Sequence, residues 1–137
     1  SGADEGAQRA LSIYGRHLGT AYQLIDDVLD FQSDPQTRGK NLGEDLAEGK
    51  PTLPLIHALR ECTGAQAEVI REGIRHGGRE RLEEIVHTIE AYGGLQYTCS
   101  RAQEQAQLAL TALEALPPTP YREALAALVR FTVSRRH

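Results

Sequence analysis

Residues 19–51 read GTAYQLIDDVLDFQSDPQTRGKNLGEDLAEGKP, and this stretch puts acidic side chains inside an otherwise apolar helical pattern. The acidic side chains are three aspartates, Asp26, Asp27 and Asp30. An aspartate inside a helix costs roughly 0.6 kcal/mol relative to alanine. Asp26 and Asp30 also repel each other across one helical turn, which costs about 0.2–0.5 kcal/mol more. The helix is therefore destabilised locally unless something compensates for the negative charge.

A bound divalent cation would provide that compensation. Asp26 and Asp30 are one turn apart on one helix face, about 6 Å along the axis, and carboxylates at this spacing can bind a hard cation through oxygen. Gln23 extends the same polar stripe by one turn. The alternative is a solvated acidic face. The apolar neighbours argue against it, because a largely buried helix should turn such a stripe towards a cation or a wet cavity.

Residues 34–50 follow, and we expect them to form an irregular loop. The segment contains Gly39, Gly43 and Gly49, which permit tight turns and exposed backbone N–H groups suited to binding anions. It also carries two lysines, Lys40 and Lys50. The alternative is a mobile, charged surface loop with no ligand.

Composition narrows the class of protein. The chain has 137 residues, enough for one domain, and a net charge of −4, which argues against nucleic acid as a partner. The two cysteines lack metal-type spacing, which fits a reducing, cytoplasmic location. No apolar run approaches the roughly 20 residues that span a bilayer. Since the chain contains no methionine, we expect it to be a piece of, or processed from, a longer protein.

Helical periodicity recurs along the whole chain, and no convincing strand pattern appears. We predict an all-α bundle of about six helices that forms a single unit over residues 1–137. The first helix is expected over residues 4–32. The other five carry the apolar residues Leu55, Ile70, Ile85, Leu110 and Val129 in turn. Thr119 is expected to cap the last of them, with Pro120 as its first residue.

Three segments together carry a family resemblance. Residues 23–31 (QLIDDVLDF) resemble the second aspartate-rich motif of the trans-type polyprenyl diphosphate synthases, and the likeness continues through residues 39–46 (GKNLGEDL) and 48–55 (EGKPTLPL). The interval from Asp30 to Lys40 matches the family as well. The tail, residues 116–125 (LPPTPYREAL), resembles the long-chain branch, in particular the bacterial octaprenyl diphosphate synthases that make quinone side chains.

The resemblance implies a fold and a reaction. The fold would be an isoprenoid-synthase-type helical bundle in which two aspartate-rich motifs face each other across a cavity. Mg²⁺ ions would hold an allylic diphosphate there. Its ionised carbon would be attacked by the double bond of isopentenyl diphosphate, which yields a long-chain all-trans product. Because half of a bundle would expose the face that meets the missing helices, we also expect a homodimer.

The same resemblance implies roles for seven residues. The metal ligands would be Asp26, Asp27 and Asp30. The residues that bind the diphosphate substrate would be Gln23, Lys40 and Lys50, and the catalytic set would be Asp26, Lys40 and Lys50. Asp45 would order the loop.

The first aspartate-rich motif of the family, and the arginines that follow it, are missing from this sequence. We therefore expect the chain alone to be inactive. Two other interpretations stay open at this point: a non-catalytic partner subunit of a complete synthase, and a helical cation-binding module.

Overall fold

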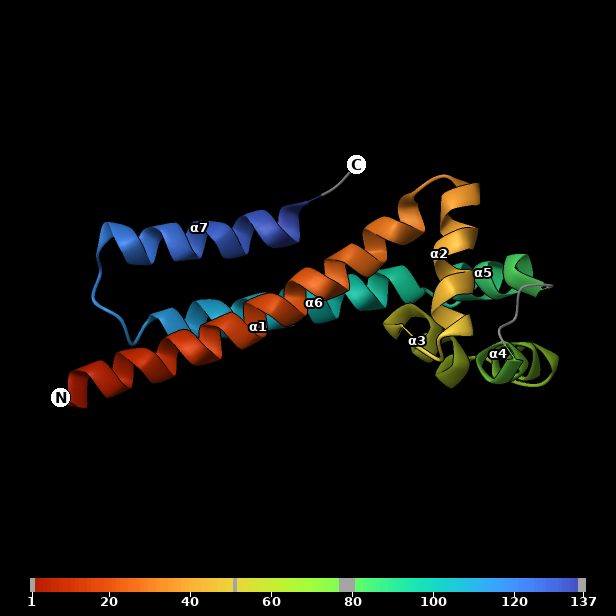
Figure 1. Cartoon of the computed structure of the whole chain (residues 1–137), viewed down its shortest axis with the longest axis horizontal. Helices are drawn as coiled ribbons and strands as arrows, with labels where there is room; N and C mark the ends of the chain where they lie inside the picture. The colour runs from red at the N-terminus through yellow and green to blue at the C-terminus, as the bar shows by residue number, and fades with distance from the viewer. Residues whose placement is uncertain (1, 51, 77–80, 136–137) are drawn as a thin grey trace. The chain divides into compact units, whose positions relative to one another are not determined.

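The computed structural model describes residues 2–50, 52–76 and 81–135, and within these ranges the chain forms seven α-helices and no strand. The predicted all-α class is confirmed (Figure 1). The helices gather into two compact units: residues 1–25 with 99–137, and residues 26–98. That the whole chain forms a single unit stays a prediction.

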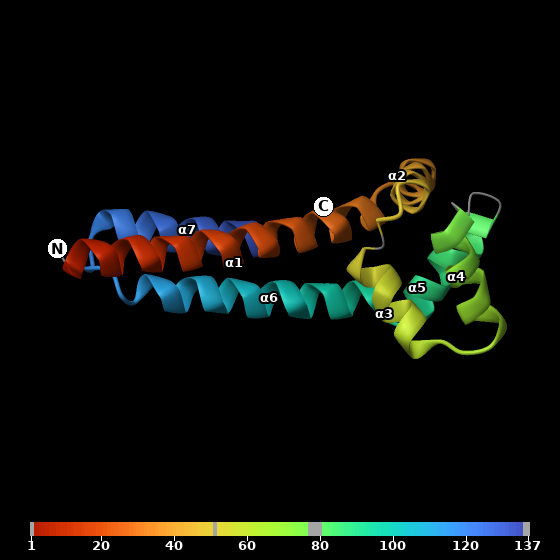
Figure 2. The same cartoon turned by 60° about the horizontal axis from the view of Figure 1, so that its bottom comes forward.

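The first unit contains three helical segments that lie side by side: the first 24 residues or so of α1 (Gly2–Gln32), most of α6 (Gly94–Leu113) and α7 (Pro120–Ser134) (Figures 1 and 2). Its core combines small alanines with larger side chains: Ala10, Tyr14, Ala106, Ala109, Leu113, Leu116 and Val129. The Tyr14 hydroxyl donates a hydrogen bond to the Leu125 carbonyl at 2.8 Å and so ties α1 to α7.

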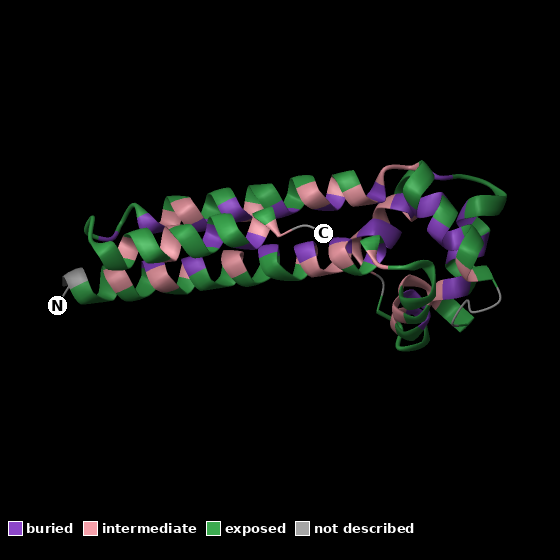
Figure 3. Ribbon diagram, turned by 90° about the horizontal axis from the view of Figure 1, so that it is seen from above, coloured by how far each residue is buried: buried purple, intermediate pink, exposed green. Residues whose placement is uncertain are grey.

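The ends and the outer face of α7 follow from its sequence. The Thr119 hydroxyl accepts a hydrogen bond from the Arg122 N–H at 3.3 Å, and Pro120 is the first helical residue, so the predicted cap is confirmed. Figure 3 shows exposed residues along the outer surfaces of these helices. On α7 that outer surface includes Tyr121, Leu128 and Phe131, which are 64%, 48% and 64% exposed.

The second unit contains four shorter helices together with the last turns of α1: α2 (Pro35–Ala47), α3 (Leu53–Glu61), α4 (Ala65–His76) and α5 (Leu82–Ala91). Helix α5 packs on α2, α3 and α4. The shared core consists of aliphatic residues with one phenylalanine and one cysteine: Phe31, Leu42, Leu46, Leu55, Ala58, Cys62, Ala67, Val69, Ile70, Ile85, Val86 and Ile89.

The irregular loop predicted for residues 34–50 is wrong, because most of it is helix α2. Asp34 caps the helix: its Oδ1 accepts hydrogen bonds from the N–H groups of Gln36 at 3.1 Å and Thr37 at 3.0 Å. Pro35 occupies the first helical position, where its missing N–H costs nothing. Leu42 and Leu46, one turn apart, are buried in the core. Tertiary packing therefore outweighs the low helix propensity of the glycines.

The helical state of α2 also changes the prediction about its glycines. Gly39 and Gly43 lie inside the helix, so their N–H groups belong to the helical hydrogen-bond pattern and do not form an anion-binding loop. Gly43 is buried, and a Cβ added there would lie 3.4 Å from Cδ1 of Leu82 on α5. The count therefore rises from the expected six helices to seven among the described residues. No helix in the described part of the chain is both long and apolar enough to cross a membrane.

Candidate functional site

The six residues predicted to form a site lie on two helices and at one helix end. Gln23, Asp26, Asp27 and Asp30 lie on the last three turns of α1. The two lysines lie farther along the chain: Lys40 is an exposed residue of α2, and Lys50 follows that helix directly.

An acidic pocket lies where the end of α1 meets α2. Eight residues line it, three of them aspartates: Asp27, Asp30, Phe31, Arg38, Asn41, Leu42, Asp45 and Thr52. Two of the three predicted metal ligands, Asp27 and Asp30, are therefore in the pocket. Gln23, Asp26, Lys40 and Lys50 are not among its lining residues.

Burial and mutual repulsion disfavour the ionised form of the carboxylates in this pocket. Burial raises the pKa of Asp27 to about 6, and repulsion from Asp45, Asp30 and Asp26 adds to the shift. Burial also raises the pKa of Asp30, with a further contribution from Asp26. The pKa of Asp45 is raised by burial and then by Asp30 and Glu48, whereas Lys50 acts in the opposite direction. A positive charge in the pocket would relieve this repulsion.

Lys50 is held near the pocket by the end of α2. Its backbone N–H donates to the Asp45 carbonyl at 2.8 Å, and its ammonium pairs with Glu48 at 3.2 Å. The Lys50 side chain is 73% exposed. An exposed ion pair of this kind is worth only about 0–1 kcal/mol, so the ammonium is available to another anion.

The residues of the pocket fit a hard divalent cation in part. Carboxylate oxygens are the ligands that Mg²⁺ and Ca²⁺ prefer. Within the ranges that the structure describes, however, no three acidic, histidine or cysteine side chains are arranged to hold a metal ion by themselves. Mg²⁺ in proteins commonly keeps several waters and binds through one or two carboxylates plus phosphate oxygens.

Sequence reasoning missed Arg38, Asn41, Thr52 and Glu90 as neighbours of the site and assigned Asp45 only a loop-ordering role. The sequence does contain a signal for these neighbours, namely the N-cap of α2. Once Asp34-Pro35 is interpreted as a helix start, Arg38, Asn41 and Asp45 fall at positions i, i+3 and i+7 of one helix face. The same face then meets the acidic end of α1, where the pocket forms.

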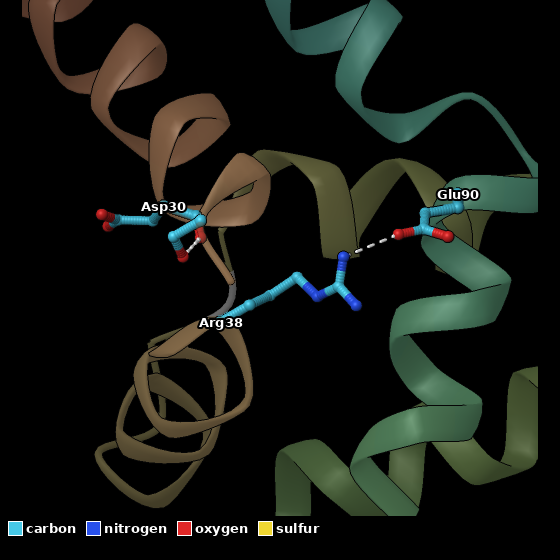
Figure 4. A network of polar contacts seen from close by, with 4 residues as sticks. Asp30, Arg38 and Glu90 are labelled. Atoms are coloured by element: carbon cyan, nitrogen blue, oxygen red, sulfur yellow. Dashed lines mark hydrogen bonds and ion pairs between the residues drawn. The ribbon is translucent and has the colours of Figure 1, made fainter. Parts of the chain in front are cut away.

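Arg38 connects the pocket to helix α5. Its Nη1 lies 3.1 Å from Oε1 of Glu90, and the two side chains are 24% and 47% exposed. Figure 4 shows the guanidinium extending towards Glu90, while the carboxylate of Asp30 points in another direction. The Ser33 hydroxyl donates to the backbone carbonyl of Asp30 and so closes the end of α1.

Known proteins resemble this chain over nearly its whole length. The family model for polyprenyl synthetase matches residues 1–91. Octaprenyl diphosphate synthase of Haemophilus influenzae is 48% identical over 138 residues, which cover 100% of this chain and 42% of that protein. The protein of the same name from Escherichia coli is 50% identical over 129 residues, which cover 93% of this chain and 40% of that protein.

A solved structure of a polyprenyl synthase also matches this chain. The crystal structure of a polyprenyl synthase from Caulobacter crescentus, complexed with calcium and isoprenyl diphosphate, matches with a TM-score of 0.75 and 40% identity. The match covers 94% of this chain and 40% of that one. The chain thus spans about two fifths of the length of the relatives it matches. The family model covers well over half of the chain, and the chain therefore belongs to the polyprenyl synthetase family.

Proposed function

We propose that this chain is the part of a trans-polyprenyl diphosphate synthase that supplies the second aspartate-rich motif. The observation that carries this proposal is its identity of 48% and 50% to two octaprenyl diphosphate synthases, over 100% and 93% of its length. The complete enzyme would join isopentenyl diphosphate to an allylic diphosphate. Because both relatives are named for an octaprenyl product, we propose octaprenyl diphosphate as the product here.

The acidic residues of α1 are the proposed metal ligands. Asp26, Asp27 and Asp30 would bind Mg²⁺ together with water and diphosphate oxygens. Three considerations support this: the carboxylate chemistry of the pocket, the repulsion that raises the pKa of Asp27 to about 6, and the calcium reported with the Caulobacter crescentus structure. Bound Mg²⁺ would neutralise charge on the diphosphate while its bond to carbon breaks.

The basic and amide side chains are the proposed diphosphate ligands. Lys40 lies on α2 and Lys50 directly after it, and both are exposed, so each ammonium is accessible to an anion from solvent. Gln23 is exposed one turn before Asp26 and can donate amide N–H groups to diphosphate oxygens. In these roles Lys40 and Lys50 would stabilise the negative charge that develops on the departing diphosphate, and Asp26 would do so through the Mg²⁺ that it holds. These three are the proposed catalytic residues.

The proposed reaction balances without a redox partner. The allylic C–O bond breaks and releases diphosphate, and the resulting carbocation is attacked by the double bond of isopentenyl diphosphate. A new C–C bond forms, and loss of one proton restores a double bond. The product is five carbons longer and keeps one diphosphate group.

A chimaera tests the assignment. The chain covers 42% of the Haemophilus influenzae enzyme, so it can replace the matching segment of that protein. We expect the chimaera to incorporate isopentenyl diphosphate into farnesyl diphosphate only when Mg²⁺ is present, and to yield a C40 product by chromatography. The doubly substituted chimaera, Asp26→Asn with Asp30→Asn, should lose at least about 100-fold in kcat, because removing a group that stabilises transition-state charge commonly costs that much.

Three outcomes contradict the proposal. One is a folded chimaera without activity. Another is full activity in the doubly substituted chimaera. The third is condensation by the 137-residue chain alone, which we expect to be inactive.

Product length is measured in the same assay, and a product other than C40 would overturn only the octaprenyl assignment. Sedimentation of the chimaera tests the homodimer that we propose for the complete enzyme.

A further inference from the structure

Arg38 lines the acidic pocket, yet its charge is engaged elsewhere. The pocket contains three carboxylates, from Asp27, Asp30 and Asp45. The Arg38 guanidinium instead pairs with Glu90 on α5, at 3.1 Å between Nη1 and Oε1 (Figure 4). Among the described residues, Glu90 is the acidic side chain with which Arg38 forms an ion pair. Within the described part of the chain, the ion pair of Arg38 is thus made with a carboxylate outside the pocket, although three carboxylates line the pocket beside it.

An arginine in this position is a potential competitor for the metal. The guanidinium is always charged, and its planar fork of N–H donors matches the two oxygens of a carboxylate. A bidentate contact with Asp30 or Asp27 would occupy the oxygen atoms that a divalent cation needs. It would also put a fixed positive charge beside the cation and repel it. Something must therefore keep Arg38 away from the pocket carboxylates.

We propose that Glu90 is a positioning residue that holds Arg38 towards α5 and so keeps the pocket carboxylates available to a Mg²⁺–diphosphate complex. The proposal rests on the proposed function, because it concerns the same metal–diphosphate site. Glu90 can hold Arg38 away from the pocket carboxylates because it lies on a separate helix. It comes from α5, 52 residues away from Arg38 in the chain, and it is not one of the residues that line the pocket.

A purely architectural role for the ion pair makes a different prediction. If the pair only fastens α2 to α5, then loss of either partner should weaken the site to a similar extent, and loss of both should bring no recovery. If Glu90 restrains Arg38, then only the loss of Glu90 is harmful. The harm should disappear when Arg38 is removed as well. A double-mutant cycle separates these two roles.

The experiment measures the affinity for inorganic diphosphate in the presence of Mg²⁺, by titration calorimetry, of the chimaera described above, in which the rest of the synthase completes this chain; this chimaera is the parent chain of the comparisons that follow. We expect Glu90→Gln to raise the Kd about two- to fivefold, the range that a partly exposed ion pair can supply. Arg38→Gln should leave the Kd unchanged or lower it. The double variant, Arg38→Gln with Glu90→Gln, should return the Kd to the value of the parent chain.

Glu83→Gln is the matched control, because Glu83 is an exposed glutamate in the first turn of the same helix. It removes the same charge from α5 without touching Arg38, and its Kd should equal that of the parent chain. Melting temperatures of all four variants show whether each remains folded. Recovery of affinity in the double variant is a result that a destabilised fold could not produce.

Two sets of results would overturn the proposal, and they differ in what they rule out. If Glu90→Gln binds as tightly as the parent, or if its loss is not rescued by Arg38→Gln, the positioning role is wrong. The variant Asp26→Asn with Asp30→Asn distinguishes this failure from failure of the proposed function. If the parent chain does not bind Mg²⁺–diphosphate, or if this variant binds as well as the parent, then the metal–diphosphate site itself is wrong and the inference falls with it.

Discussion

The backbone N–H of Lys50 donates to the carbonyl oxygen of Asp45 at 2.8 Å, and this bond closes the C-terminus of α2. A second bond, from the Gly49 N–H to the Leu46 carbonyl at 3.1 Å, lies inside the first. The two bonds form a Schellman motif, which requires a left-handed residue just beyond the helix. Gly49 fills that position with a φ of +72°. The location of Lys50 relative to Asp45 therefore depends on a glycine.

Substitution of Gly49 by alanine should destabilise the chain. A left-handed backbone brings the Cβ close to the following carbonyl and costs about 1–2 kcal/mol. Gly39→Ala is the matched comparison, since Gly39 lies inside the same helix and a Cβ there meets nothing within 4 Å. It should stabilise the chain by up to about 1 kcal/mol, because alanine favours the helix over glycine. Urea unfolding of both variants measures the two effects. Changes of the same sign would contradict this account of how α2 ends.

A second prediction concerns the end of α7. The Arg135 guanidinium lies 4.0 Å from the centre of the Tyr22 ring, and it donates to the Tyr22 carbonyl at 3.2 Å. Its Nε also donates to the Thr132 carbonyl at 3.3 Å. Arg135→Ala should therefore speed hydrogen exchange in the last turn of α7 and cost about 0.5–1.5 kcal/mol in the free energy of unfolding.

Arg130→Ala is the control for this change, because Arg130 is an exposed arginine on the same helix. It should leave exchange in the last turn as it is in the parent chain. Arg135→Lys should recover only part of the loss, since an ammonium lacks the planar face that stacks on a ring. Equal exchange in the Arg135→Ala and Arg130→Ala variants would mean that the Tyr22 contact does not hold the helix end.

Most of the fold could be predicted because most helices have an unambiguous apolar period. The N-cap of α7 was correct for the same kind of reason, since Thr119-Pro120 combines a capping side chain with a preformed φ. The α2 segment failed because its three glycines suggest a loop, while the burial of Leu42 and Leu46 against α4 and α5 depends on helices far away in sequence. Local propensity cannot report that burial.

Fewer of the residues around the pocket than of the helices could be predicted from the sequence. The aspartates of α1 were found because charges inside an apolar helix are locally anomalous. Their partners across the pocket, Asp45 and Arg38, became visible only when α2 proved to be helical. Glu90 could not be found at all from sequence, because only the fold brings α5 next to Arg38. The roles of Gln23, Lys40 and Lys50, and those of the three aspartates of α1, remain predictions.

A third prediction tests the corner between α5 and α6. Gly94 is buried as the first residue of α6, and a Cβ added there would lie 2.9 Å from Cγ2 of Ile89 and 3.0 Å from the Pro54 carbonyl oxygen. Gly94→Ala should therefore cost about 1–3 kcal/mol through overpacking. Gly15→Ala, in α1 where a Cβ meets nothing within 4 Å, should not destabilise the chain. A melting temperature for Gly94→Ala that equals or exceeds that of the parent chain would contradict the close packing.

The last prediction follows from the pKa of Asp27, which is raised from 3.8 to about 6. A carboxyl with a raised pKa binds its proton more tightly in the folded chain than in the unfolded one. Its contribution to stability is therefore unfavourable above about pH 6 and disappears as the pH falls towards 3.8. Asp27→Asn should remove that penalty. We expect it to stabilise the chain at pH 7.5 by on the order of 1–3 kcal/mol, the upper limit applying only if solvent does not screen the charge.

Urea unfolding at pH 4 and pH 7.5 measures this difference, and the gain from Asp27→Asn should shrink at the lower pH. Asp34→Asn is the control, because hydrogen bonds from Thr37 and then Gln36 lower the pKa of Asp34. Its favourable contribution is lost only as the pH falls below about 3.8, outside the measured interval, and asparagine remains a good helix cap. Asp34→Asn should therefore shift stability equally at both pH values. If Asp27→Asn did the same, the Asp27 carboxyl would not be strained by burial and by its acidic neighbours, and the electrostatic argument for a cation in this pocket would lose its main support.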